Sequence, residues 1–408
     1  MKILHINTFN QQGGAETIAY SLFKSNRNNT LLVGKKSKNE PNIIEFKKDF
    51  QDKFFTFLTK LKWRFRADDS FKKILFIEEE FNHTYRKLKN LIEYQEADII
   101  HLHNIHGGYF DLSALENIAQ EKKIVWTLHD MWCMTGGEAH IFENENYKKG
   151  IGKTPYLQVP PLKNPLIDRR QHFLELKKQI YSKIAPSITF VPVSNWLDKC
   201  LHESFVWDKS IPSEVIHNGI DNRIFYKNSV KNQDLIPKIL LFNSNNIFKG
   251  ENIFQEVLEK IEHPFELYVV GNPIAISNKK LTQLHHFEPI SDRIKLATLY
   301  NSIDVLLFPS KADNFPLVPI EAMACGVCVL ASDVGGIPEI IKHQQTGFLF
   351  KNKSELTILL NNILNNPNLI STIGEAGSKF VSSNLSLENM VCKYQNLYNK
   401  ILGHNTIL

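Results

Sequence analysis

The sequence lacks any long hydrophobic run. No segment approaches the roughly 18 consecutive apolar residues that a membrane-spanning helix needs. The opening residues, MKILHINTF, contain a single lysine and reach Asn7 before an apolar run develops, so they do not resemble a secretory signal peptide. From these two absences we expect a cytoplasmic protein, free or bound peripherally at the inner face of a membrane.

Cysteine is also scarce. The five cysteines are scattered along the chain, so a disulfide framework is not expected. Cys325 and Cys328 form a C-x-x-C pattern, but they lie in AMACGVCVLAS, which is typical of a helix end followed by a buried strand. We therefore expect neither redox chemistry nor zinc there, and we assign no metal-binding residues.

Tandem repeats, low-complexity tracts and recognised nucleic-acid-binding modules are absent too. The net charge is only +5, so nucleic acid is not an expected partner. Basic residues gather in residues 47–73, interleaved with Phe, Trp and Leu. Two interpretations of this insertion, about residues 47–90, stay open: a helical segment on an anionic membrane surface, or an amphipathic helix that packs its aromatic side chains on its own domain.

What the sequence does contain is an alternation of short apolar runs and helix-like segments. In the first half the runs lie at residues 1–9, 29–34, 97–104 and 122–130, and the pattern restarts after a polar connection at residues 221–234. Strands that are apolar throughout are typical of parallel sheets covered on both faces, which predicts an α/β fold. A chain of 408 residues has room for two such domains.

We place the domain boundary near residue 218. Residues 1–218 are expected to form one Rossmann-like domain and residues 219–384 a second, facing each other across a cleft. The final residues, 385–408, contain an amphipathic segment that we expect to form a helix packing back across the hinge onto the first domain.

Glycine and lysine follow several of the predicted strands. Gly13 and Gly14 precede a helix, Gly271 ends a strand, and Lys249 lies in a loop before Gly250. Glycines before a helix let backbone N–H groups approach an anion, and a lysine adds a positive charge to the same place. The full G-x-G-x-x-G fingerprint is missing, but these positions are suited to a pyrophosphate.

Three histidines lie at predicted strand ends in the first half. His101 and His103 alternate along one strand and so share a face. They can be hydrogen-bonded structural residues or metal ligands, and no third ligand lies nearby with suitable spacing. His129 ends the run IVWTL, directly before Asp130, and we favour a catalytic role for it over an interdomain contact.

The most specific segment is PSKADNFPLVPIEAMACG, residues 309–326. It carries two carboxylates, Asp313 and Glu321, after an apolar strand, and we expect Glu321 to lie in the first turn of the following helix. This order resembles the signature of the family 4 retaining glycosyltransferases, which have the GT-B fold. Other segments resemble motifs of that family in the same order: GGAE at 13–16, TLHDMW at 127–132 with TGG at 135–137, VSNWL at 193–197, VIHNGID at 215–221, KG at 249–250 and GGIPE at 335–339.

The resemblance implies an enzyme that moves a sugar from a nucleoside-diphosphate donor to a glycan or lipid-linked acceptor, with retention of anomeric configuration. Surface polysaccharide biosynthesis is the expected setting, and the resemblance implies no metal or other cofactor. Residues 1–218 would serve the acceptor and residues 219–384 the nucleotide sugar. Glu321 would accept hydrogen bonds from the ribose hydroxyls, while the backbone amides near Leu317 and Val318 would hold the diphosphate.

The resemblance also assigns the reacting end of the donor. Lys249 would supply a cation to the diphosphate, Asp313 would contact the transferred sugar, and His129 would lie beside the reacting carbon; these three form the expected catalytic set. Gly14 would let its loop approach the distal phosphate. The expected donor-binding residues are Gly13, Gly14, Lys249, Gly271, Asn314, Phe315, Leu317, Val318 and Glu321.

The chain departs from the family pattern at several positions. Asp313 stands where glutamate is usual, and Pro316 where glycine is common. The arginine usual upstream of Lys249 is replaced by NSNN at 243–246, and His217 replaces a common proline without an evident chemical role. An alternative therefore stays open, namely a catalytically degenerate partner subunit that binds a nucleotide sugar or glycan without turnover.

Overall fold

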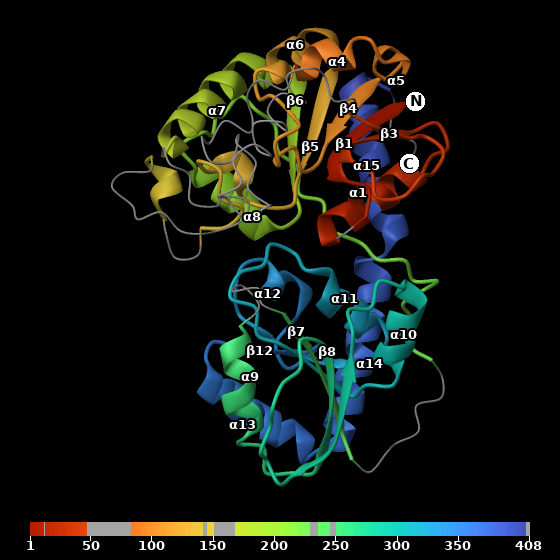
Figure 1. Ribbon diagram of the computed structural model, residues 1–408, viewed down its shortest axis with the longest axis vertical. Helices are drawn as coiled ribbons and strands as arrows, with labels where there is room; N and C mark the ends of the chain where they lie inside the picture. The colour runs from red at the N-terminus through yellow and green to blue at the C-terminus, as the bar shows by residue number, and fades with distance from the viewer. Residues whose placement is uncertain are drawn as a thin grey trace, which may run out of the picture. The chain divides into compact units, whose positions relative to one another are not determined.

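The computed structural model describes residues 1–11, 13–46, 83–141, 145–150, 168–228, 236–244 and 250–404. The chain forms two compact units (Figure 1). The first comprises Met1–Ile216 together with Lys393–Leu408, and the second comprises His217–Cys392. Most of the basic and aromatic insertion, residues 47–82, lies outside the described residues.

The first unit is built around a six-stranded sheet in the order β3-β2-β1-β4-β5-β6, in which every neighbouring pair is parallel. The inner strand IIHL is buried along its whole length, as expected for a parallel sheet covered by its connecting helices. The strands are β1 (Ile3–Phe9), β2 (Thr30–Lys35), β3 (Ile43–Glu45), β4 (Ile99–Leu102), β5 (Lys123–Leu128) and β6 (Ile188–Pro192).

Helices connect these strands and bury an apolar side on the sheet. In α1 (Gly14–Lys24), the stripe Ile18, Ala19, Leu22 and Phe23 is buried, as its helical spacing predicts. The other helices of this unit are α4 (Thr84–Leu88), α5 (Ile92–Gln95), α6 (Ala114–Glu121), α7 (Arg170–Ile184) and α8 (Asn195–Glu203), with short 3₁₀ turns at Trp132–Met134, Glu145–Lys148 and Ala185–Ser187.

The second unit repeats this architecture with a sheet in the order β12-β11-β10-β7-β8-β9, again parallel throughout. Its strands are β7 (Lys238–Asn243), β8 (Phe265–Gly271), β9 (Leu281–Phe287), β10 (Val305–Phe308), β11 (Cys328–Ser332) and β12 (Phe348–Phe350). Its helices are α9 (Glu251–Leu258), α10 (Arg293–Asn301), α11 (Leu317–Ala324), α12 (Ile337–Ile340), α13 (Lys353–Leu364) and α14 (Pro367–Asn384). The prediction of two Rossmann-like domains is therefore confirmed.

Strand order determines where each unit can hold a ligand. In doubly wound sheets, ligands bind beyond the carboxyl ends of the strands at the point where the order reverses. In the first unit this point lies between β1 and β4, and in the second it lies between β7 and β10. In the sequence, these strands are followed by the GGAE segment and His103 in the first unit, and by Lys249 and Asp313 in the second.

The last helix, α15 (Leu387–Leu402), confirms the helix predicted near the C-terminus. Its part from Lys393 onward belongs to the first unit, where Tyr394 and Tyr398 are buried. Among the helices that the structure describes, none combines the length and the apolar character needed to cross a bilayer.

Candidate functional site

The loop between β10 and α11, residues 309–316, is fixed by close backbone contacts. The carbonyl oxygen of Pro309 approaches Gly250, where a Cβ would lie only 2.0 Å away, and Gly250 has a positive φ of 71°. The carbonyl oxygen of Asp313 accepts a hydrogen bond from the Gly336 amide at 3.1 Å, and a Cβ on Gly335 would lie 2.0 Å from the same oxygen. Only glycine fits at these two positions, which explains the KG and GGIPE segments.

A stacked ring pair fixes the other end of this loop. His217 lies parallel to Phe315, with ring centroids 4.7 Å apart and an interplanar angle of 7°. Its Nε2 lies 3.0 Å from a carboxylate oxygen of Glu339, and Asn218 donates to the carbonyl of Phe315 at 2.9 Å. The histidine that replaces the usual proline therefore has a structural role, which sequence reasoning missed.

The loop residues assigned to the donor differ in exposure. Asp313 is half-buried, and its Oδ2 accepts a hydrogen bond from the Ser310 hydroxyl at 2.8 Å. Asn314 and Phe315 are buried, and α11 begins at Leu317, after Pro316. The backbone amides in the first turn of a helix have no partner within that helix, so α11 offers donors to an anion at Leu317 and Val318.

Glu321 is the most unusual carboxylate of the second unit. It is 5% exposed, and its neighbours are the Arg293 guanidinium at 3.3 Å and the Tyr300 hydroxyl at 3.5 Å. Burial raises the pKa of this carboxyl to about 7, against the opposing influence of Arg293 and then Tyr300. A carboxyl that titrates near neutral pH in a predicted ligand site is a candidate for function rather than for stability.

One expectation about Glu321 is wrong. The helix begins at Leu317, after an extended Pro316, so Glu321 is the fifth residue of α11 and lies beyond its first turn. Its charge is therefore less stabilised by the helix N-terminus than a first-turn carboxylate would be, because that effect falls off within one turn.

Gly271 and Lys249 are the remaining donor-binding residues predicted in the second half of the chain. Gly271 ends β8 with a φ of 104°, and a Cβ there would lie 2.1 Å from the Asn243 carbonyl oxygen. The glycine is thus required by the close approach of the two backbones. Lys249 lies outside the described residues, as do Asn245 and Asn246 of the segment that replaces the family's arginine.

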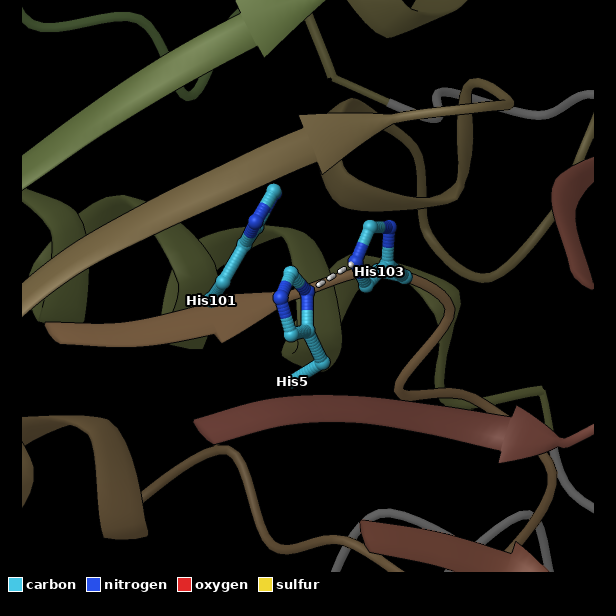
Figure 2. A group of neighbouring side chains, drawn as sticks. All are labelled: His5, His101 and His103. Atoms are coloured by element: carbon cyan, nitrogen blue, oxygen red, sulfur yellow. Dashed lines mark hydrogen bonds between the residues drawn. The ribbon is translucent and has the colours of Figure 1, made fainter. Parts of the chain in front are cut away.

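In the first unit, five polar side chains share one face of the sheet. His5 on β1 pairs in register with His101 on β4, and His103 follows two residues later on the same face. On β5 the register places Thr127 and His129 on this face as well. Figure 2 shows His5, His101 and His103 grouped together.

The group of His5, His101 and His103 lacks the geometry of a metal site. Their ligand atoms lie within 4.8 Å of one another, but the rings of His101 and His103 are stacked, with centroids 4.2 Å apart and an interplanar angle of 29°. Metal-bound imidazoles point their lone pairs at one ion about 2.0 Å away, which stacked rings do not. Both nitrogens of His101 are already hydrogen-bonded, to the hydroxyls of Tyr398 at 2.6 Å and Thr127 at 2.8 Å.

His129 follows β5 and is half-buried. Its Nε2 lies 3.1 Å from Nδ1 of His103, and burial lowers its pKa to about 4, so the ring is neutral at neutral pH. The adjacent Asp130 lies 3.1 Å from His106, and burial raises the pKa of the nearby Glu16 carboxyl. A polar cluster thus surrounds the predicted catalytic histidine.

The segment after His129 is held by α7. Lys177 is fully buried and donates to the carbonyls of Trp132 and Thr135, at 2.5 and 2.9 Å, with its ammonium 3.8 Å from the Trp132 ring centroid. The Tyr181 hydroxyl donates to the Cys133 carbonyl at 2.9 Å. Sequence reasoning missed Lys177, because a lysine in a helix is usually exposed.

Gly13 and Gly14 lie where they were expected, at the start of α1. Gly13 precedes the helix with an extended backbone, its carbonyl accepts from the Thr17 amide at 3.0 Å, and both glycines are exposed. Glu16 lies in the first turn of α1.

Comparison with known proteins finds similarity to glycosyltransferases, with a family match in the second unit. Residues 237–380 match the family described as "Glycosyl transferases group 1", and this segment includes every site residue predicted for the second half of the chain. The "Putative colanic acid biosynthesis glycosyl transferase WcaC" of Escherichia coli (strain K12) is 27% identical over 342 residues, which are 78% of this chain and 80% of that protein. The "N-acetyl-alpha-D-glucosaminyl L-malate synthase" of Bacillus anthracis is 29% identical over 335 residues, or 78% of each chain.

Solved structures confirm the fold. Sucrose-phosphate synthase from Thermosynechococcus elongatus superposes with a TM-score of 0.63 at 16% identity, covering 98% of this chain and 99% of that one. Anabaena HepE, solved in complex with UDP, superposes with a TM-score of 0.64 at 14% identity, covering 98% and 100%. The chain therefore has the GT-B fold of glycosyltransferases, as the sequence predicted.

Proposed function

We propose that this protein transfers a sugar from a nucleoside-diphosphate donor to a glycan or lipid-linked acceptor, retaining the anomeric configuration and using no metal. The observation that carries the proposal is the group 1 match over residues 237–380, within which Glu321 is a buried carboxylate that titrates near neutral pH. Buried carboxyl groups with a strongly raised pKa are concentrated at binding and catalytic sites.

The second unit would bind the donor. The amides of Leu317 and Val318 at the start of α11, together with Lys249, would receive the diphosphate, whose negative charge grows as the sugar departs. Glu321, once ionised, would accept hydrogen bonds from the ribose hydroxyls. Asp313, held by Ser310 in a fixed loop, would contact hydroxyls of the transferred sugar.

Retention follows if the acceptor attacks from the face that the diphosphate leaves. The departing phosphate oxygen would take the acceptor's proton, so the new bond forms on the face where the old one broke. In this mechanism the protein supplies fixed amides, an ammonium and positioning side chains, which need no reorganisation as charge develops. His129 would contact the transferred sugar, and Gly14 would leave room for the distal phosphate.

The acceptor is proposed from the relatives. WcaC is named for colanic acid biosynthesis, which fits a glycan or lipid-linked acceptor in surface polysaccharide assembly. Such acceptors lie at membranes, and the basic aromatic residues 47–73 would hold the enzyme at the inner face. Residues 47–73 lie outside the described part of the chain, and sedimentation with anionic liposomes tests their role.

Turnover of a panel of nucleotide sugars tests the proposal. We expect wild type to release nucleoside diphosphate from one or more donors without added metal and in the presence of a chelator. The first-formed sugar product, followed by NMR before mutarotation, should keep the donor's anomeric configuration. Lys249→Ala and Asp313→Asn should lower kcat at least tenfold, whereas Glu288→Gln, an exposed carboxylate of the same unit, should not.

Two results would contradict the proposal. Release of the inverted anomer would exclude retention. Thermal stabilisation by a nucleotide sugar with no release of diphosphate, in the presence of oligosaccharide and lipid-linked acceptors, would instead support the degenerate binding subunit.

A further inference from the structure

A continuous chain of imidazole rings leads from the sheet interior of the first unit to His129. Nδ1 of His5 lies 3.2 Å from Nε2 of His103, and Nδ1 of His103 lies 3.1 Å from Nε2 of His129. Figure 2 shows the first of these hydrogen bonds, between β1 and the residue that follows β4. Both ring nitrogens of His103 are thus used by other histidines.

All three rings are neutral at neutral pH, because burial lowers the pKa of His5 to about 3, that of His129 to about 4 and that of His103 well below its usual value. A neutral imidazole has one N–H donor and one acceptor nitrogen. The two hydrogen bonds between the three rings must therefore point in the same direction, with each ring donating to the next.

The buried end of the chain selects the direction. Nε2 of His5 is fully buried and has no hydrogen-bond partner among the described residues. If the chain ran from His129 toward His5, this atom would carry an unpaired buried N–H. If it ran the other way, the atom would be a bare acceptor, which is the more common of the two in folded proteins.

We propose that His5 and His103 act as positioning residues that fix the tautomer of His129, with its proton on Nδ1 and its Nε2 occupied as an acceptor. The functional part of this inference rests on the proposed glycosyl transfer. With its Nε2 lone pair engaged by His103, His129 acts as a hydrogen-bond donor of fixed orientation and not as the proton acceptor of the reaction.

His101 provides a matched control. It is as buried as His103 and stacks on it, but it hydrogen-bonds to Tyr398 and Thr127 instead of joining the chain. The same substitution at the two positions therefore removes similar packing. Only the change at His103 removes a hydrogen bond to His129.

The direct test is the tautomer of His129 in the ¹⁵N-histidine-labelled protein, read from its ring nitrogen shifts and assigned with His129→Gln. We expect wild type and His101→Leu to carry the proton on Nδ1. His103→Leu should lose this preference, and His103→Asn should keep it, because the Asn amide can present a donor N–H to Nε2 of His129 from near the position of Nδ1. A proton on Nε2 of His129 in wild type, or an unchanged tautomer in His103→Leu, would overturn the proposal.

Turnover gives a second, separable readout. His103→Leu should lower kcat about tenfold, as for the loss of one hydrogen bond from the transition state, while His103→Asn recovers most of it and nucleoside diphosphate binding stays unchanged. If the tautomer results hold but no nucleotide sugar is turned over, the glycosyl transfer proposal fails and the assignment stands. If transfer occurs and His129 carries its proton on Nε2, the assignment fails alone.

Discussion

Glu321 is expected to destabilise the second unit at neutral and alkaline pH. Burial raises the pKa of its carboxyl from 4.5 to about 7. The folded protein therefore holds this proton more tightly than the unfolded chain, and stability falls as the pH rises between the two values. The difference of about 2.5 pKa units corresponds to about 3 kcal/mol, which is lost from the free energy of unfolding above pH 7.

Glu321→Gln keeps the shape of the side chain but cannot ionise. We expect the variant to be more stable than wild type by up to about 3 kcal/mol at pH 8, and the difference to vanish only well below pH 4.5, where the wild-type carboxyl is protonated in both states. Each kcal/mol corresponds to about 2–4 °C in Tm for a unit of this size. Thermal unfolding across this pH range measures the effect, with Glu288→Gln as the exposed control.

Two outcomes would refute this reasoning. Equal Tm values for wild type and Glu321→Gln at pH 8 would show that the carboxyl is well solvated in the folded state. A difference that does not shrink as the pH falls would show that its origin is not ionisation. The expected result would identify Glu321 as a residue that is kept for ligand binding at the expense of stability.

Three further predictions concern other parts of the chain. Gly335→Ala should destabilise the second unit by about 2 kcal/mol and lower turnover, because its Cβ would clash with the carbonyl oxygen of Asp313. Gly403→Ala is the control: its φ of 73° is similar but no atom of the described residues lies near the added Cβ, so it should lower Tm less and leave turnover unchanged. Lys177→Met should lower Tm by several degrees because it removes the ammonium that donates to the buried carbonyls of Trp132 and Thr135, whereas Lys183→Met, at an exposed position, should not; equal Tm values would contradict the buried role. Charge reversal in the basic insertion should reduce sedimentation with anionic liposomes, and unchanged partitioning would exclude the membrane role. The positions to change to Glu are Lys60, Lys62, Arg64 and Arg66.

The sequence was informative where the signal is local. Continuous apolar runs such as IDVLLF predict buried parallel strands because both faces of the sheet are covered, and the spacing of Ile18, Leu22 and Phe23 predicts the buried side of α1. The KG and GGIPE segments were recognised only by their resemblance to family motifs, and the close backbone contacts at Gly250 and Gly335 supply the physical reason for their glycines.

Pairings between distant residues could not be predicted in this way. Arg293 lies 28 residues before Glu321 and His5 lies 98 residues before His103, and nothing in local spacing connects them. The third histidine of the buried group was missed for this reason, since β1 and β4 become neighbours only in the folded sheet. Likewise, the stacking of His217 on Phe315 gives a role to a residue that had none in the sequence.

Glu321 is proposed to bind the ribose of a nucleotide donor, and the donor site depends on this contact. Calorimetry should compare a nucleoside diphosphate with its 2′,3′-dideoxy analogue, each binding to wild type and to Glu321→Gln above pH 7. We predict that wild type binds the ribose form about tenfold to a hundredfold more tightly, as for a hydrogen bond to a charged group, and that the variant binds both forms alike. If wild type and variant prefer the ribose form over the dideoxy form by the same factor, Glu321 does not bind the ribose.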